Sequence, residues 1–109
     1  MRFFTKATLL GLILAFSAHA EADKKIVRTW KAKCASCHGA EGKADTETGK
    51  KGKIPDFTTA EWQKSKTDAQ IKAAIENGAK KEGAEMDPFK DKLDAATIDG
   101  LVQYIRSFK

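Results

Sequence analysis

Two cysteines and a histidine, side chains well suited to binding a metal or a cofactor, lie together in the segment Cys34-Ala-Ser-Cys37-His38. A disulfide between Cys34 and Cys37 would close a very small loop and would stabilise the chain little. A thioredoxin-type redox pair needs a neighbouring strand–helix–strand pattern, which the sequence lacks. Structural zinc sites use four Cys or His ligands, so zinc would have to recruit a carboxylate as well. These three chemistries therefore fit the segment poorly.

The same spacing is the signature of covalent haem attachment. At the end of a helix, Cys34, Cys37 and His38 occupy positions i, i+3 and i+4 and project from one face. Two thioether bonds to one edge of the haem would leave the imidazole of His38 under the iron as an axial ligand. We therefore expect one haem c, attached through both cysteines, with His38 bound to its iron.

The second axial ligand has to come from elsewhere in the chain, and Met86, 48 residues after His38, offers a thioether. Methionine is commonly a flexible filler of cores. Met86, however, lies in a segment rich in glycine and charged residues, from 78 to 89, which we predict to be a loop. Methionine opposite histidine is a known pair of haem ligands. We therefore predict Met86 as the second ligand, with Lys80, Lys81 or water as the alternatives.

The first twenty residues have the organisation of a secretory signal peptide. Arg2 and Lys6 precede an apolar stretch over residues 7–16, and small residues stand at Ala18 and Ala20. A helix that spans a membrane needs roughly 17–25 apolar residues, so a retained membrane anchor is the weaker interpretation. We expect cleavage after Ala20, which leaves a periplasmic protein of 89 residues without stable membrane insertion.

Removal of this segment changes the composition from which the chain builds its core. The net charge falls from +5 to +3, with 18 basic and 15 acidic residues, and no tract of one sign remains that would favour nucleic-acid binding. Leu, Ile, Val and Phe number only 13 of the 89 residues. Small domains with so thin a core usually depend on a disulfide, a metal or a cofactor. The composition thus agrees with a bound haem.

Apolar spacing predicts the elements that must position these ligands. A helix is expected from Ala22 to about Lys33, leading into the first cysteine. Residues 39–53 are expected to form a loop, and a short helical turn is expected to begin near Thr59.

Capping residues predict two further helices. Thr67 and Gln70 form a capping box, and the helix that follows is expected to end at Asn77-Gly78. Asp94 is expected to cap a final helix. The apolar stripe of that helix comprises Ile98, Leu101, Val102, Ile105 and Phe108.

With these features the sequence resembles the class I cytochromes c, which are small exported carriers of a single haem. The likeness rests on CASCH after a helix that contains Trp30, on Pro55-Asp56-Phe57, on Ile75-Glu-Asn-Gly78, on Met86-Asp-Pro88-Phe89 and on Leu101-Val-Gln-Tyr104. It implies an all-α, small cytochrome c-like fold, with three to four helices and loops wrapped around one covalently attached haem. It covers nearly all of residues 21–109, which we interpret as a single monohaem domain.

The resemblance also assigns supporting roles. The carbonyl of Pro55 is expected to accept a hydrogen bond from His38 Nδ1, which would hold the imidazole in one tautomer. Phe57 is expected to pack on the haem. Trp62 is either a donor to a haem propionate or an aromatic residue of the core.

Two positions depart from the family pattern. Ile26 stands where the family often has a glycine that lets the terminal helices approach. We expect either that Gly100 opens the crossing from the other side or that the two helices stand further apart. Asp87 stands between Met86 and Pro88, although proline usually follows the ligand methionine directly.

An iron with both axial positions filled exchanges electrons but does not readily bind a substrate, so we expect an electron carrier and no enzyme. The alternative is a haem-based sensor, in which Met86 leaves the iron and a small ligand enters. The expected partners are donor and acceptor redox proteins, and the protein is expected to be a monomer. The candidates for steering acidic partners are Lys43, Lys50, Lys51, Lys80 and Lys81.

Overall fold

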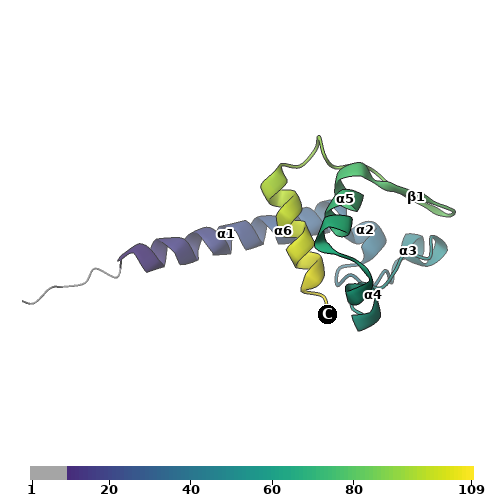
Figure 1. Cartoon of the computed structure of the whole chain (residues 1–109), viewed down its shortest axis with the longest axis horizontal. Coiled ribbons are helices and arrows are strands. Elements are labelled where there is room, and N and C mark those ends of the chain that lie inside the picture. The colour runs from purple at the N-terminus through teal and green to yellow at the C-terminus, as the bar shows by residue number, and fades with distance from the viewer. Residues whose placement is uncertain (1–9) are drawn as a thin grey trace, which may run out of the picture.

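The computed structural model describes the backbone of residues 10–109 and the side chains of residues 22–109. The first helix, α1, runs from Leu10 to Lys33 (Figure 1). The helix predicted from Ala22 to Lys33 is confirmed, and it continues N-terminally into the predicted signal peptide. Residues 1–9 of that peptide lie outside the described residues, and its cleavage stays a prediction. No helix within the described range combines the length and the apolar character needed to cross a membrane.

Helix α5 spans Asp68–Asn77 and follows its predicted boundaries. It begins at the predicted capping box, where the Thr67 hydroxyl accepts the Gln70 N–H and the Gln70 side chain accepts the Thr67 N–H. Gly78 ends the helix with a φ of +76°, a conformation that glycine adopts without strain. Both ends of this helix are therefore set by local side-chain chemistry.

Helix α6 spans Ala95–Arg106. As predicted, the carboxylate of Asp94 caps it, accepting the Thr97 N–H at 2.8 Å. Its apolar stripe is buried at Ile98, Leu101, Val102 and Ile105, and Phe108, just beyond the helix, is half-buried.

Short helices fill the chain between α1 and α5. Helix α2, Ala35–His38, carries the cysteine–histidine segment. Helix α3, Glu47–Lys51, lies within residues 39–53, so the prediction of a loop there was wrong over those five residues. Helix α4, Ala60–Ser65, is the short turn expected near Thr59.

The segment from 78 to 89 is not the simple loop that we predicted. It contains an antiparallel hairpin of β1, Ala79–Lys81, and β2, Ala84–Met86, with Ala79 opposite Met86. Each strand has only three residues, which is too short for the alternating apolar pattern that identifies strands. Gly83, with a φ of +89°, lies in the turn between the strands.

The core forms where the end of α1 crosses α6 (Figure 1). Trp30 and Leu101 are each only 1% exposed at this crossing. A Cβ at Gly100 would lie 2.5 Å from Ile26 Cδ1, so the missing side chain at Gly100 gives Ile26 its space, which is the first of the two alternatives. The predicted helical class is confirmed. Within residues 10–109, however, there are six helical segments and one hairpin, where three to four helices were expected.

Candidate functional site

A cavity of about 590 Å³ opens between the end of α1, α2, α5 and the hairpin. Its lining is mostly apolar, and it draws on segments that are far apart in the sequence. The cavity therefore forms only when these distant segments pack together. The lining includes every residue predicted to bind the cofactor: Cys34, Cys37, His38, Pro55, Phe57 and Met86.

Backbone hydrogen bonds continue the helical path from α1 into α2. The Cys34 N–H donates to the Trp30 carbonyl at 2.8 Å, and the His38 N–H donates to the Cys34 carbonyl at 3.0 Å. This continuity places Cys34, Cys37 and His38 on one helical face, and all three line the cavity. Thr46 holds the segment from outside, because its hydroxyl donates to the Cys37 carbonyl at 2.7 Å.

The two thiols are free and half-buried. Burial, and secondarily the neighbouring Cys37, raises the pKa of the Cys34 thiol to about 11, so this thiol is protonated at neutral pH. This setting differs from the electropositive surroundings that lower the thiol pKa of redox-active cysteines. In the part of the chain that the structure describes, no group of three or more His, Cys, Asp or Glu side chains is arranged to hold a metal ion.

His38 occupies an apolar setting. Its Nδ1 is buried without a hydrogen-bond partner among the described residues, so the bond to the Pro55 carbonyl that the family resemblance implies is not formed here. Burial lowers the pKa of the imidazole, which favours the neutral form that binds metals. The Phe57 ring stacks on it with 4.9 Å between centroids, and Trp30 lies 5.9 Å away. Because Nδ1 is the atom expected to donate to Pro55, the ring nitrogen available to a metal is Nε2.

The hairpin brings Met86 to the same cavity. Alternate residues of a strand share a face, which puts Ala84 and Met86 on one side of β2, opposite Lys81 and Ala79 on β1. All four residues line the cavity, and Met86 is half-buried. One face of the hairpin therefore forms a wall of the site, with the thioether on it.

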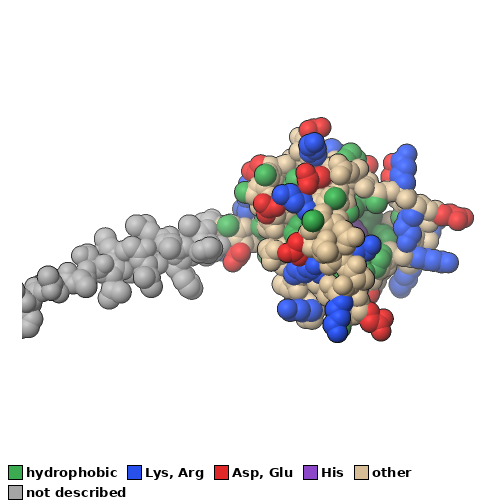
Figure 2. Space-filling view, in the orientation of Figure 1, with side chains coloured by type: hydrophobic (Ala, Val, Ile, Leu, Met, Phe, Trp, Pro, Cys, Tyr) green, Lys and Arg blue, Asp and Glu red, His purple; other side chains and the backbone are tan. Residues whose placement is uncertain are grey.

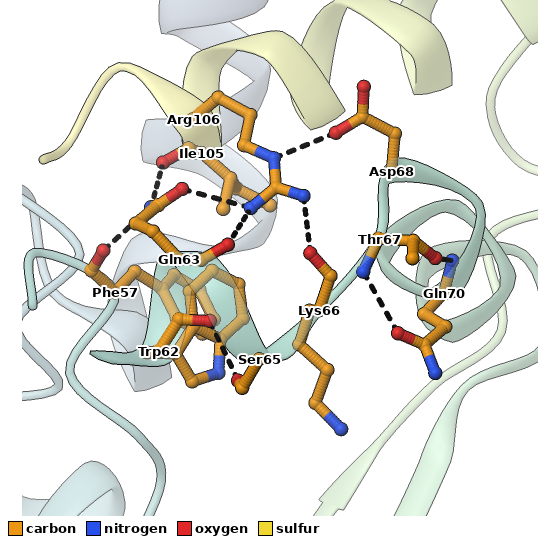
Figure 3. A network of polar contacts seen from close by, with 10 residues as sticks. All are labelled: Phe57, Trp62, Gln63, Ser65, Lys66, Thr67, Asp68, Gln70, Ile105 and Arg106. Atoms are coloured by element: carbon orange, nitrogen blue, oxygen red, sulfur yellow. Dashed lines mark hydrogen bonds and ion pairs between the residues drawn. The ribbon is translucent and has the colours of Figure 1, made fainter. Parts of the chain in front are cut away.

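A network of hydrogen bonds reaches the backbone of Phe57 (Figure 3), whose ring stacks on His38. The Gln63 side chain donates to the Phe57 carbonyl at 2.7 Å and to the Ile105 carbonyl at 3.0 Å. The guanidinium of Arg106 donates in turn to Gln63 Oε1 at 3.0 Å. Sequence patterns missed Gln63 and Arg106, because polar residues on a short helix and at a helix end are typical of any solvated face.

Trp62 packs on Phe57 in the wall of the cavity. Its ring centroid lies 4.2 Å from that of Phe57, and it lines the cavity in a half-buried position. The aromatic role considered for this residue is therefore present, while donation to a propionate stays a prediction.

Charged side chains surround the cavity without a patch of one sign. Figure 2 shows positive and negative side chains interspersed on the face in view. Of the five lysines considered for steering, only Lys81 lines the cavity. Lys43 pairs with Glu41 at 3.3 Å, and Lys80 pairs with Glu85 at 3.5 Å. Further charged residues of the lining are Lys33, Lys66, Glu85 and Asp87.

The residues of this cavity fit a haem c. Two free thiols at helical spacing can form the thioether bonds, and His38 and Met86 offer an imidazole and a thioether to the iron. The large and mostly apolar volume suits a macrocycle.

Comparisons with known proteins agree with this fit. The family model described as cytochrome c oxidase, cbb3-type, subunit III matches residues 21–105. The solved structure of the KustC0563 c-type cytochrome is 32% identical, with a TM-score of 0.66, over 76% of this chain and 95% of that chain. A tyrosine-to-phenylalanine mutant of Kustc0563 gives a TM-score of 0.67 at 32% identity, over 77% of this chain and 98% of that chain. No curated protein matches the sequence significantly. The small cytochrome c-like fold is thereby confirmed.

Proposed function

Because this chain belongs to the cytochrome c family whose model is described as cbb3-type cytochrome c oxidase subunit III, we propose that it is a periplasmic electron carrier with a single haem. Family membership makes it a haem-based electron-transfer protein. We further propose that the chain binds one haem, that His38 and Met86 are its two axial ligands, and that the protein works in the periplasm. The observation that carries it is the convergence of Cys34, Cys37, His38 and Met86 on one cavity.

Each of these residues has a distinct role in the proposal. Cys34 and Cys37 hold the haem through two thioether bonds, which prevents its loss to a dilute compartment. His38 is the first axial ligand, kept neutral by burial and oriented by the stacked ring of Phe57. Met86 is the second axial ligand and leaves no position vacant for a substrate.

When bound, the haem iron supplies a one-electron Fe(III)/Fe(II) couple, and a thioether ligand raises its reduction potential. The apolar lining, which includes Trp30, Ile71 and Ile75, would shield the iron of a bound haem from water. Solvent access and local dielectric are among the factors by which a protein tunes a redox potential. The chain thus contributes ligands, orientation and a dry environment.

A haem-based sensor is the second candidate, and the location of Met86 favours it. Met86 lies on a three-residue strand of a two-stranded hairpin, and an isolated hairpin is only marginally stable in water. Release of Met86 would open one position on the iron to a small ligand. The carrier is preferred because the Met86 side chain already lines the cavity in a half-buried position.

The N-terminal sequence supports export to the periplasm. A positive start, an apolar stretch and small residues before the expected cleavage point are typical of secretory signal peptides. The family match begins at residue 21, directly after that point, which supports one haem domain over residues 21–109. Intact-mass measurement should give a chain that begins at Glu21 and carries one haem. An uncleaved chain or a second haem would contradict this part of the proposal.

Donor and acceptor redox proteins are the proposed partners of a monomer. They would dock where the cavity reaches the surface, near Lys33, Lys66 and Lys81. Because Glu85 and Asp87 line the same cavity, charge steering by lysines alone is expected to be modest.

The absorption spectrum of a Met86→Ala variant tests the ligand assignment. The ferric wild-type protein should be low-spin and should show the weak near-infrared band of methionine–Fe(III) ligation. Met86→Ala should lose this band and have a lower reduction potential, because the thioether that favours Fe(II) is gone. The haem should remain attached, since both cysteines are unchanged.

Lys80→Ala and Lys81→Arg are the matched controls, because both lysines lie on β1 and are the alternative ligands. Arginine at position 81 removes the amine but can still donate to the Lys53 carbonyl, as Lys81 does. Both variants should retain the near-infrared band. An unchanged spectrum in Met86→Ala, or loss of the native ligation only in a lysine variant, would remove Met86 as the ligand.

A further inference from the structure

We propose that Gly52 positions Met86 by letting the β1–β2 hairpin rest directly on the turn that follows α3. This inference rests on the proposed role of Met86 as the second axial ligand. Gly52 does not itself line the cavity. It is a positioning residue that acts through Ala84.

The hairpin meets the end of α3 through residues that lack bulky side chains. Gly52 is buried, and a Cβ built on it would overlap the methyl group of Ala84 on β2. At the hairpin turn, a Cβ on Gly83 would lie 2.8 Å from the carbonyl oxygen of Lys51 and 3.3 Å from Gly52 Cα. The two backbones therefore approach more closely than a side chain at either glycine would permit.

The backbone conformation of Gly52 does not account for glycine at this position. Its φ is −84° and its ψ is 0°, the values of the third residue of a type I turn, which most residue types tolerate. The Ala84 methyl group is the one atom that a Cβ at position 52 would overlap, whereas the carbonyl oxygens of Thr48 and Gly83 would lie at 3.3 and 3.4 Å.

A second contact holds the same end of the hairpin. The Nζ of Lys81 on β1 donates to the Lys53 carbonyl at 2.9 Å. Lys81 is opposite Ala84 in the register of the hairpin. Both strands are thus anchored on the segment from 51 to 53, close to the turn.

Met86 is coupled to this anchor by the geometry of β2. Ala84 and Met86 are alternate residues on the cavity-facing side, separated by about 7 Å at the usual rise of a strand. Only Glu85 lies between them. A displacement of the hairpin at Ala84 therefore displaces the thioether.

Competition by imidazole for the iron of the ferric holoprotein measures this positioning. Imidazole can bind only where Met86 has left the iron, so its apparent dissociation constant depends on the population of that open state. Gly52→Ala should lower this constant at least about fivefold. Fivefold corresponds to about 1 kcal/mol at 1.4 kcal/mol per factor of ten, the low end of the usual effect of overpacking.

The rescue variant Gly52→Ala/Ala84→Gly moves one methyl group from β2 to the end of α3. Because the overlap is then removed, this variant should bind imidazole within about twofold of wild type. Gly100→Ala is a matched control for general destabilisation, since its Cβ would also meet a neighbour closely, at the α1–α6 crossing. It should leave imidazole binding unchanged.

Equal imidazole binding by Gly52→Ala and wild type would overturn the inference, as would a rescue variant that still binds like Gly52→Ala. If Gly52→Ala yields no holoprotein, the rescue variant decides alone: wild-type binding supports the contact, and absence of holoprotein overturns it. A wrong ligand assignment is separately visible, because Met86→Ala would then keep the spectrum of wild type.

Discussion

Gly100→Ala should destabilise the protein, although the same substitution in an open helix is stabilising by about 1 kcal/mol. Gly100 lies in α6 where that helix crosses α1. A Cβ at this position would be 2.5 Å from Ile26 Cδ1 and 2.8 Å from Ile26 Cγ1, whereas ordinary contacts begin at 3.4 Å. Ile26 would have to yield by roughly 0.6–0.9 Å.

The magnitude follows from two opposing effects. Overpacking of a tight contact destabilises by about 1–3 kcal/mol, and the gain in helix propensity offsets about 1 kcal/mol of that. Rotation of Ile26 about χ2 can move Cδ1 away but leaves Cγ1 close to the new methyl group, and χ1 of isoleucine in a helix is restricted to one strongly preferred rotamer. We therefore expect a net loss of about 1 kcal/mol, which lowers the melting temperature by about 4–8 °C in a domain of this size.

Urea unfolding of the holoprotein, followed by circular dichroism, measures this loss. The matched background is Ile26→Ala, which removes both atoms that the new Cβ would meet. In that background Gly100→Ala should be neutral or stabilising, so the double-mutant cycle should give a coupling of about 1–2 kcal/mol. A stabilising effect of Gly100→Ala in the wild-type protein, or an equal destabilisation in both backgrounds, would refute a steric conflict between position 100 and Ile26.

Two further predictions concern polar contacts at the helix ends. Arg106→Ala should lower the free energy of unfolding by about 1–3 kcal/mol in urea, because Gln63 loses a charged hydrogen-bond donor. Arg106→Lys should recover only part of this, and full stability of Arg106→Ala would contradict the role of the network in Figure 3. Stability should also fall below about pH 4. Hydrogen bonds from Thr97, and secondarily Lys25, hold the pKa of Asp94 below its ordinary range, so its contribution is present at neutral pH and is lost as the pH falls through that lowered pKa. Asp94→Asn should flatten this part of the thermal-unfolding pH profile, and a profile identical to wild type would refute the assignment.

The helix boundaries were predictable where the determining chemistry is local. The side chains of Thr67 and Gln70 each accept a hydrogen bond from the backbone N–H of the other residue, within a span of four residues. The Asp94 side chain likewise caps α6 over four residues, by accepting the Thr97 N–H. The ligand candidates were predictable for a different reason. Reactive residue types are scarce in this chain, so the spacing from Cys34 to His38 indicates its chemistry without reference to the fold.

The rest depends on contacts between distant segments. The hairpin has three-residue strands, and its position is set by the approach of Ala84 to Gly52, which no local pattern reveals. Gln63 joins the carbonyls of Phe57 and Ile105, residues 48 positions apart. The role of Gln63 is therefore visible only after the chain has folded.

The reaction of the ferrous wild-type protein with carbon monoxide tests the central claim most directly. If His38 and Met86 fill both axial positions, the reduced spectrum should be low-spin and should change little and slowly when carbon monoxide is added. A five-coordinate, high-spin ferrous form that binds carbon monoxide rapidly would contradict the electron-carrier account and would favour the sensor.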